Sequence, residues 1–367
     1  MKYQNILNKA INDQELTFDE GVFLYEEAPL EALQKAANQI RINKTNPKTV
    51  SYLIDRNINY TNVCITNCKF CNFYRTPQHD GAYVLSKEIL REKIEETIAV
   101  GGTRILMQGG HHPDLRLDWY IELLTWLKKE FPSIELDCFS PSEIDNICLL
   151  ENKDAETILK ALIEAGLQGL PGGGAELLDD EIRQKVSPKK ISGSRWLEIM
   201  EIAHKLNLHT SASMVIGFGE NAKNRIKHFD LLRNQQKKSL NKYNNGFIAF
   251  IAWPLQHELT PLGKQSQNSG KLGATKEEYL RNLAIARIYL NPYFENIQAS
   301  WPTMGFKVAQ EALSYGANDF GSTMLEENVV SQASTKTHKF ILVDDICKLI
   351  NEAGYKPVQR LTDYSIL

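Results

Sequence analysis

Three cysteines in one short polar segment constrain this chain more than any other feature of its sequence. Cys64, Cys68 and Cys71 have the spacing C-x3-C-x2-C, inside a loop-like stretch that begins at Asn59 and ends at Arg75. This spacing folds three thiolates around a corner so that they face one point, as ligation of an iron–sulfur cluster requires. Four irons held by three cysteines leave one iron open to a small molecule. The spacing therefore predicts a [4Fe–4S] cluster with an open position.

A zinc site is the alternative interpretation of these cysteines. A closed structural zinc site takes four protein ligands, typically from two C-x2-C pairs. The other cysteines, Cys138, Cys148 and Cys347, are scattered singly, so the sequence has no second pair. The spacing favours a cluster over zinc, and a colourless protein with stoichiometric zinc would contradict it.

The bulk composition narrows the class of protein. The 367 residues carry a formal net charge of −3, which gives no reason to expect nucleic acid as a partner. Six cysteines, half of them clustered, are typical of a reduced, metal-binding chain rather than a disulfide-bonded one. The first residues do not resemble a signal peptide, and the longest apolar run, residues 247–255, is too short to span a bilayer. We expect a cytoplasmic enzyme with no membrane partner.

Strand-like and helix-like stretches alternate from residue 48 onward, which is typical of an α/β protein. Short apolar or β-branched runs predict eight strands, at residues 50–54, 104–107, 134–139, 167–170, 210–216, 247–253, 297–301 and 317–320. Helical segments separate nearly all of them, with Ser86, Asp154 and Thr275 as expected N-caps. This order predicts a parallel sheet closed as a (β/α)8 TIM-like barrel. A doubly wound open sheet is the alternative, because periodicity cannot show closure.

The chain divides into three parts around this expected barrel. Residues 1–45 are charged and helix-rich, and they predict an N-terminal helical extension packed outside the main fold. Residues 46–343 are expected to form the barrel. Residues 344–367 are expected to form a C-terminal helix and tail packed on the barrel.

Residues of unusual chemistry follow the predicted strands at their carboxyl ends, where active sites lie in barrels of this kind. They are Gln108, Gly109, Gly110, His111 and His112 after the second strand, Ser140 after the third, Gly173 and Glu176 after the fourth, and Asp319 in the eighth. Glycine lets a backbone approach a ligand closely, although a tight turn needs it equally. The adjacent histidines cannot both point into one pocket from a regular strand. At most one is expected to transfer protons or bind substrate. Glu176 and Asp319 are also residue types that favour a helix start without any function.

The segment around the cysteines, with Phe70 directly before the third, resembles the radical S-adenosylmethionine (SAM) superfamily. Further blocks resemble the branch of that superfamily that serves the futalosine pathway of menaquinone biosynthesis, and its cyclases most closely. These blocks are residues 55–75, 108–114, 139–144, 170–176, 296–301 and 315–329. Cys138 departs from the expected pattern, where a histidine or a small residue would stand, so we assign it no catalytic role.

The resemblance implies a [4Fe–4S] cluster on Cys64, Cys68 and Cys71, with SAM bound to the open iron. Together with the strand-end positions, it predicts cofactor-binding roles for Phe70, Gln108, Gly109, Gly110, Ser140, Gly173 and Glu176. The strand-end positions alone make His111, His112 and Asp319 the candidate catalytic residues, with at most one of the two histidines in the site. In similar enzymes a 5′-deoxyadenosyl radical abstracts the ribose C4′ hydrogen of dehypoxanthine futalosine, and the carbon radical then attacks the substrate's own benzoate ring. An external one-electron reductant such as flavodoxin or ferredoxin is the implied partner.

A benzoate on the substrate implies a clamp of cations or several donors. The sequence offers Arg56, Arg75, Arg183 and Lys307, and we expect Arg56 and Arg75 first because they flank the cysteine loop. Trp253 and Trp301 either line a pocket for the aromatic ring or belong to the core.

Two other functions stay open at this level. The first is a sister enzyme, aminofutalosine synthase, with the deazaflavin-forming enzymes as more distant members of the superfamily. The second is a non-catalytic iron–sulfur module for electron transfer, which would not cleave SAM. Production of 5′-deoxyadenosine by the anaerobic protein separates the enzymes from the module.

Overall fold

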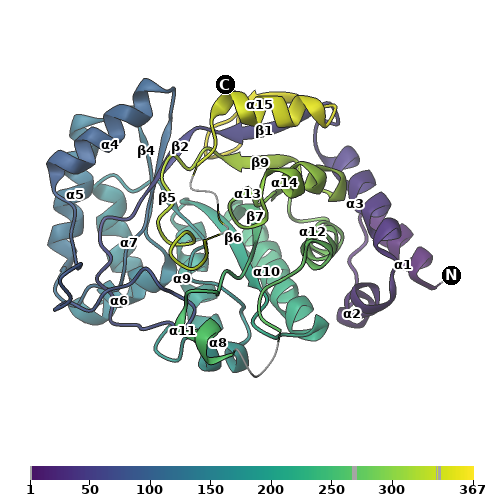
Figure 1. Cartoon of the computed structure of the whole chain (residues 1–367), viewed down its shortest axis with the longest axis horizontal. Coiled ribbons are helices and arrows are strands. Elements are labelled where there is room, and N and C mark those ends of the chain that lie inside the picture. The colour runs from purple at the N-terminus through teal and green to yellow at the C-terminus, as the bar shows by residue number, and fades with distance from the viewer. Residues whose placement is uncertain (1, 267–270, 336, 338–339) are drawn as a thin grey trace.

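The computed structural model describes residues 2–266, 271–335, 337 and 340–367 of the chain. Its strands form one parallel sheet that curls on itself, and helices cover the outer side of the sheet (Figure 1). The strands are β1 (Thr49–Leu53), β2 (Asp55–Ile58), β3 (Arg104–Met107), β4 (Glu135–Cys138), β5 (Gly169–Leu170), β6 (His209–Ile216), β7 (Phe247–Pro254), β8 (Asn296–Gln298), β9 (Asp319–Ser322) and β10 (Lys356–Gln359). The predicted α/β TIM-like fold is confirmed.

The order of strands explains how the sheet takes the form of a barrel. It runs β10-β1-β9-β8-β7-β6-β5-β4-β3-β2. Only Ile54 separates β1 from β2, yet β1 pairs with β9 while β2 pairs with β3. One extended segment, residues 49–58, therefore joins the two sides of the curled sheet, which a doubly wound open sheet would not do.

Each of the eight predicted strands is present, as β1 and β3 to β9, and two further strands were not predicted from the sequence. β2 reads Asp-Arg-Asn-Ile and lacks an apolar pattern, because Asp55 and Asn57 are buried polar residues on the inner side. β10 reads Lys-Pro-Val-Gln and lies at the end of the strand order, a position where proline is tolerated.

Helices connect most of the strands and provide the outer layer. They are α1 (Lys2–Ile11), α2 (Phe18–Glu27), α3 (Leu30–Lys44), α4 (Lys87–Ala99), α5 (Leu117–Glu130), α6 (Pro141–Glu151), α7 (Ala155–Glu164), α8 (Asp180–Val186), α9 (Gly193–Lys205), α10 (Ala222–Tyr243), α11 (Pro261–Gln265), α12 (Lys276–Leu290), α13 (Trp301–Met304), α14 (Phe306–Ala312), the 3-10 helix η1 (Leu313–Tyr315) and α15 (Val343–Glu352). Ser86, Asp154 and Thr275 cap α4, α7 and α12 through their side chains, as predicted. Within the described ranges, no helix is both long enough and apolar enough to cross a membrane.

The first three helices lie together at one side of the molecule, outside the sheet (Figure 1). Their buried side chains include Leu24 of α2 and Leu33 and Ala37 of α3, and Arg281 of α12 donates to the backbone carbonyls of Tyr25 and Ala28. This part of the chain packs against the outer helices and leaves the inside of the barrel to other segments.

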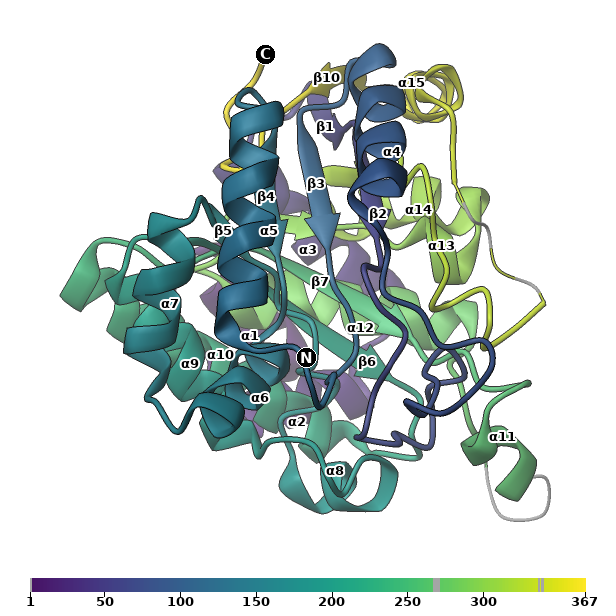
Figure 2. The same cartoon turned by 90° about the vertical axis from the view of Figure 1, so that its left-hand side faces the viewer.

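The two ends of the barrel carry different segments. In Figure 2, β3 points toward the side where α8 and α11 lie, whereas β10 and the C-terminus lie at the opposite side. The carboxyl ends of the strands therefore face the loops around α8 and α11. The segment 344–367, expected as a helix and tail, contains all of α15 except its first residue, Val343, and also adds β10 to the sheet beside β1.

Candidate active site

A cavity of about 430 Å³ runs through the inside of the barrel. Its lining at the carboxyl ends of the strands includes Cys64, Cys68, Phe70, Cys71, Gln108, Gly109, Gly110, His111, Ser140, Glu143, Gly173, Glu176 and Lys190. Its lining toward the amino ends includes Arg104, Asp137, His209, Arg360, Thr362 and Tyr364. Most of the site residues predicted from the sequence therefore share one chamber.

Arg75, the last residue of the cysteine loop (residues 59–75), holds the loop in its conformation through hydrogen bonds. The backbone N–H of Cys64 donates to the carbonyl of Arg75 at 2.9 Å, and the N–H of Arg75 donates to the carbonyl of Asn62 at 2.7 Å. The Arg75 guanidinium donates to the carbonyls of residues 72, 73 and 74 at 3.0, 3.1 and 2.8 Å. Arg75 does not line the cavity, so its charge organises the loop.

All three thiols of the loop line the cavity, and none forms a disulfide. Burial raises the pKa of Cys68 to about 12 and also raises the pKa of Cys71. Thiolates in such a place need a cation to stabilise them, and iron supplies that charge. Among the residues that the structure describes, no three His, Cys, Asp or Glu side chains converge on a position for a single metal ion. A cluster takes one thiolate on each of three irons, so its thiolates face one cluster without sharing a single metal ion. Three thiols on the wall of one cavity are the donor set that such a cluster takes.

Glycines at the end of β3 let the cysteine loop lie directly against the strand. A Cβ on Gly110 would overlap the carbonyl oxygen of Val63, and a Cβ on Gly109 would stand 2.5 Å from the ring of Tyr60. A Cβ on Gly173 would stand 2.5 Å from the side-chain amide nitrogen of Gln108. These close contacts are enough to explain why glycine stands at the three positions. All three glycines also line the cavity.

Gly110→Ala is expected to lower the free energy of unfolding by about 1–3 kcal/mol, because the added methyl group overpacks the contact with Val63. The displaced loop should also bind less iron. Gly193→Ala is the matched control, since its Cβ would meet its nearest neighbours at 3.4 Å, an ordinary contact. Chemical denaturation and iron content of both variants measure the effect, and equal stability of the two would contradict this account of Gly110.

Glu143 is a cavity residue that we did not predict from the sequence. Its Oε1 accepts hydrogen bonds from the N–H of Gly109 and the hydroxyl of Tyr60, each at 2.9 Å. Its Oε2 accepts from the hydroxyl of Ser140 at 2.7 Å, and Ser140 in turn caps α6. The spacing Ser-x-x-Glu is a helix-start signal, which could have drawn attention to Glu143. The carboxylate ties the glycine stretch of β3 to α6.

Burial raises the pKa of Glu143 to about 7, although its three hydrogen bonds favour the ionised form. A carboxylate with a raised pKa stabilises the fold most below its ordinary pKa, and that stability is lost as the pH rises toward 7. Compared with Glu143→Gln, the wild-type protein should lose roughly 3 kcal/mol of unfolding free energy from pH 4.5 to 7. Urea unfolding at several pH values measures this, and a pH-independent difference would contradict it.

Glu176 is held by two cations on the wall of the cavity. Its Oε1 lies 2.6 Å from Nζ of Lys190, and its Oε2 lies 3.3 Å from the Arg183 guanidinium. Burial opposes ionisation of Glu176, but Lys190 and Arg183 outweigh it and lower the pKa. Lys190, also not predicted from the sequence, lines the cavity 5.9 Å from the ring centroid of Phe70.

The two neighbouring histidines take different positions, as their adjacency requires. His111 lines the cavity, whereas His112 does not, and Nδ1 of His112 accepts from the N–H of Asp114 at 3.1 Å. Burial, with a smaller contribution from Lys190, lowers the pKa of His111 to about 3. A neutral His111 can exchange hydrogen bonds inside the chamber, and His112 belongs to the loop outside it.

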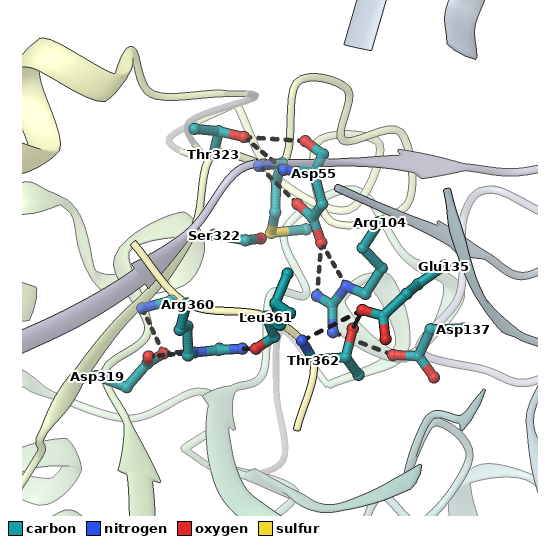
Figure 3. A network of polar contacts seen from close by, with 12 residues as sticks. Asp55, Arg104, Glu135, Asp137, Asp319, Ser322, Thr323, Arg360, Leu361 and Thr362 are labelled. Carbon is teal, nitrogen blue, oxygen red and sulfur yellow. Dashed lines mark hydrogen bonds and ion pairs between the residues drawn. The ribbon is translucent and has the colours of Figure 1, made fainter. Parts of the chain in front are cut away.

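Asp319 does not line the cavity but fixes a residue that does (Figure 3). Its carboxylate is fully buried and pairs with Arg360 at 2.6 and 3.1 Å. It also accepts from the hydroxyl of Ser51 at 2.5 Å and the N–H of Gly321 at 2.9 Å. The structure thus makes Asp319 a positioning residue for Arg360 instead of a group that meets substrate.

The basic residues expected as a carboxylate clamp lie elsewhere. Arg56 pairs with Glu96 and Glu326, and Arg183 donates to Glu176 and to backbone carbonyls. Like Arg75, neither lines the cavity, and Lys307 lies in a separate surface recess between α14 and α15. Within the described residues, the lysine and arginine side chains that line the cavity are Arg104, Lys190 and Arg360.

The two tryptophans separate into a wall residue and a core residue. Trp253 lines the cavity at the end of β7. Trp301 is 1% exposed, and its indole N–H donates to the carbonyl of Ser322 at 3.0 Å. Only Trp253 is placed to meet a bound aromatic group.

Comparisons with known proteins cover the whole chain. Residues 58–232 match the family model for the radical SAM superfamily, and residues 244–367 match the model for the CofH/MqnC C-terminal region. A cyclic dehypoxanthine futalosine synthase from Halalkalibacterium halodurans is 45% identical over 368 residues, which cover 100% of this chain and 95% of the relative.

Less similar proteins carry the names of other activities. A 5-amino-6-(D-ribitylamino)uracil–L-tyrosine 4-hydroxyphenyl transferase from Methanopyrus kandleri is 34% identical over 332 residues, covering 90% of this chain and 88% of the relative. The crystal structure of methylornithine synthase (PylB) superposes with a TM-score of 0.73 at 19% identity, covering 96% of this chain and 97% of that one. This last likeness supports the fold alone.

Proposed function

The chain belongs to the radical SAM superfamily and is an enzyme, and from this premise we propose that it converts dehypoxanthine futalosine to its cyclic product in menaquinone biosynthesis. The observation that carries the proposal is the 45% identity to a cyclic dehypoxanthine futalosine synthase along the entire chain. The transferase relative is less similar, at 34% identity. The difference favours cyclisation over transfer to a second substrate.

We assign the [4Fe–4S] cluster to Cys64, Cys68 and Cys71, and SAM to the adjoining mouth of the cavity. When bound there, this pair would supply the radical chemistry that abstraction of the ribose C4′ hydrogen requires. Gln108 and the backbone of Gly109 and Gly110 line this mouth and can bind the polar groups of SAM. Glu143 holds Gly109 in place through its N–H, so its contribution is to orientation.

Unsatisfied polar atoms on the wall support a substrate rich in hydroxyl groups. Oδ1 of Asn57, Oδ1 of Asn59 and Oγ of Ser142 are buried, line the cavity and have no hydrogen-bond partner among the described residues. A buried polar atom without a partner costs about 1–3 kcal/mol. Ribose hydroxyls can satisfy these atoms, and their binding would orient C4′ within the walled lumen.

The substrate carboxylate requires a cation inside the chamber. Lys190 lines the cavity and has three N–H donors, of which Glu176 accepts one at 2.6 Å. Arg360 is anchored by Asp319 near the opposite end. We therefore propose Lys190 and Arg360, and no longer Arg56 and Arg75, as the residues that bind the substrate carboxylate.

The test is turnover by the anaerobic protein with a reconstituted cluster, SAM and dithionite. Dehypoxanthine futalosine should give 5′-deoxyadenosine together with the cyclic product. Separate reactions contain the acceptor used by aminofutalosine synthase, or 5-amino-6-(D-ribitylamino)uracil with L-tyrosine. A coupled product only in one of those reactions would overturn the proposal in favour of that activity. A cluster without any SAM cleavage would indicate an electron-transfer module.

A further inference from the structure

We propose that Asp137 accepts the proton that the cyclised substrate loses when its ring becomes aromatic again. The inference rests on the proposed function, because it concerns the last step of that reaction. Asp137 lies on β4, lines the cavity and was not predicted as a site residue from the sequence.

Four carboxylates line the cavity in the described part of the chain, and three of them are fully engaged. Both oxygens of Glu143 accept hydrogen bonds, and both oxygens of Glu176 pair with cations. Glu327 accepts three backbone N–H groups, from residues 329, 330 and 331. Asp137 differs, because Arg104 binds only its Oδ2, at 3.0 Å, and its Oδ1 has no hydrogen-bond partner among the described residues. Asp137 is the wall carboxylate with a vacant acceptor oxygen.

A glycine on the neighbouring strand makes room for that oxygen. Asp137 pairs in register with Gly169 on β5, and a Cβ at position 169 would overlap Oδ1, so only glycine lets the carboxylate take this position. On its other side Asp137 pairs with Leu106 on β3, two residues before Gln108. Two residues along a strand span roughly 7 Å, so Asp137 lies one layer of side chains below Gln108, away from the cysteine loop. A substrate that binds below SAM would therefore meet Asp137.

Arg104 holds the carboxylate in place by an ion pair, as Figure 3 shows. The guanidinium spans two strands, with Asp55 of β2 at 2.5 Å and Asp137 at 3.0 Å. Because Arg104 is itself anchored by Asp55, Oδ2 of Asp137 stays fixed while Oδ1 is left for the cavity. A base that is held by one oxygen can take a proton on the other without leaving its position.

The proposed step removes one proton and one electron from the cyclised substrate radical. Attack of the ribose carbon radical leaves the attacked ring carbon tetrahedral, with one hydrogen still bound. That C–H bond breaks, the proton moves to Oδ1 of Asp137, and the electron pair of the bond returns to the ring and restores its aromaticity. One surplus electron then leaves to a one-electron oxidant, an oxidised iron–sulfur centre.

The groups around Asp137 make its carboxylate more basic, so that it can accept and keep a proton. Burial raises its pKa to about 6, against the effect of Arg104, which lowers it. Asp55 and Glu135 raise the pKa further and His209 lowers it, so charged or titratable groups face Asp137 from β2, β3, β4 and β6. Asp137 is then mostly ionised at neutral pH, yet more basic than an exposed aspartate.

The test is Asp137→Asn in the full chain with a reconstituted cluster. The variant should still form 5′-deoxyadenosine, while the amount of cyclic product per 5′-deoxyadenosine falls about 100-fold, a typical contribution of a general base. In the wild type this ratio should rise with pH through about 6, because the base must be ionised. An unchanged ratio in the variant overturns the proposal. Failure of the wild type to make cyclic product instead overturns the proposed function and this step with it.

Asp145→Asn is the matched control, because Asp145 also pairs with an arginine, Arg195, at 2.7 Å, and neither residue lines the cavity. This variant should keep the ratio of product to 5′-deoxyadenosine. If it uncouples the reaction as strongly as Asp137→Asn, the loss of an aspartate–arginine pair is the cause and Asp137 is not the base. If a His111 variant lowers the ratio of cyclic product to 5′-deoxyadenosine and Asp137→Asn does not, the neutral imidazole of His111 accepts the proton. This result would overturn the proposal as well.

A readout on the cluster-free protein does not depend on turnover. The folded-state pKa of Asp137 is raised from 3.8 to about 6, so its ionisation disfavours the fold. Compared with Asp137→Asn, the wild type should therefore lose stability as the pH rises from about 4 to about 6. A difference that does not change over this range would show that Asp137 has an ordinary pKa, and would remove the electrostatic basis of the proposal.

Discussion

Replacing Cys68 by alanine is expected to abolish both the brown colour of the reconstituted protein and all detectable 5′-deoxyadenosine. Cys68 is a buried residue that lines the cavity, and burial raises its pKa to about 12. A buried site of this kind offers no water-exposed side chain to replace the missing ligand. Iron and sulfide content, the visible spectrum, and SAM cleavage under dithionite measure the loss.

Cys347→Ala is the control for the cluster prediction. Cys347 lies on α15, outside the cavity lining, so its removal should leave iron content and SAM cleavage unchanged. If the Cys68 variant kept a full cluster and cleaved SAM, the assignment of the three cysteines would be wrong. Stoichiometric zinc in a colourless wild type would overturn it equally.

Arg360→Ala is expected to lower the free energy of unfolding by about 3–5 kcal/mol, because it leaves the carboxylate of Asp319 buried without its cation. The pair is almost fully enclosed, with side-chain exposures of 3% for Arg360 and 0% for Asp319. The tail that follows Arg360 should also loosen, since the guanidinium donates to the carbonyl of Leu361 at 3.0 Å. Urea unfolding of the cluster-free protein measures the cost.

Arg195→Ala provides the comparison for Arg360. Its guanidinium pairs with Asp145 at 2.7 Å, a similar distance, but the two side chains are 29% and 15% exposed. Water screens that pair, so the expected cost is about 1 kcal/mol or less. Equal costs at the two sites would show that Asp319 does not depend on Arg360.

The sequence was sufficient to predict the fold, and most of the residues predicted for the site line one cavity. The cysteine spacing identified the loop, and alternating strands and helices identified the barrel, because both are local patterns. β2 was not predicted because its buried side chains are polar: Asn57 lines the cavity and Asp55 pairs with Arg104. The same reason explains why Asp137 was missed, since it is a single charged residue inside a short strand.

The sequence could not predict site residues whose position depends on contacts between segments distant in the chain. Lys190 and Glu176 are 14 positions apart, and no local pattern announces that Lys190 reaches the cavity. Arg56 and Arg75 flank the cysteine loop in sequence, yet their guanidinium groups bind partners outside the chamber. Proximity along the chain was a poor guide to which cations face inward.

The segment formed by residues 49–58 has a consequence for how the enzyme matures. Its neighbours are β3, which follows it closely in the chain, and β9 and β10, which come from the last fifty residues; the hydroxyl of Thr323 donates to the carbonyl of Asp55 across 268 positions. Such distant contacts form slowly during folding, because the intervening chain must first be brought together. The loop that carries the cysteines follows this segment directly. A ribosome-bound chain therefore holds its thiols on an unfinished scaffold until its last strands emerge, and we expect cells to load iron and sulfide only after synthesis is complete.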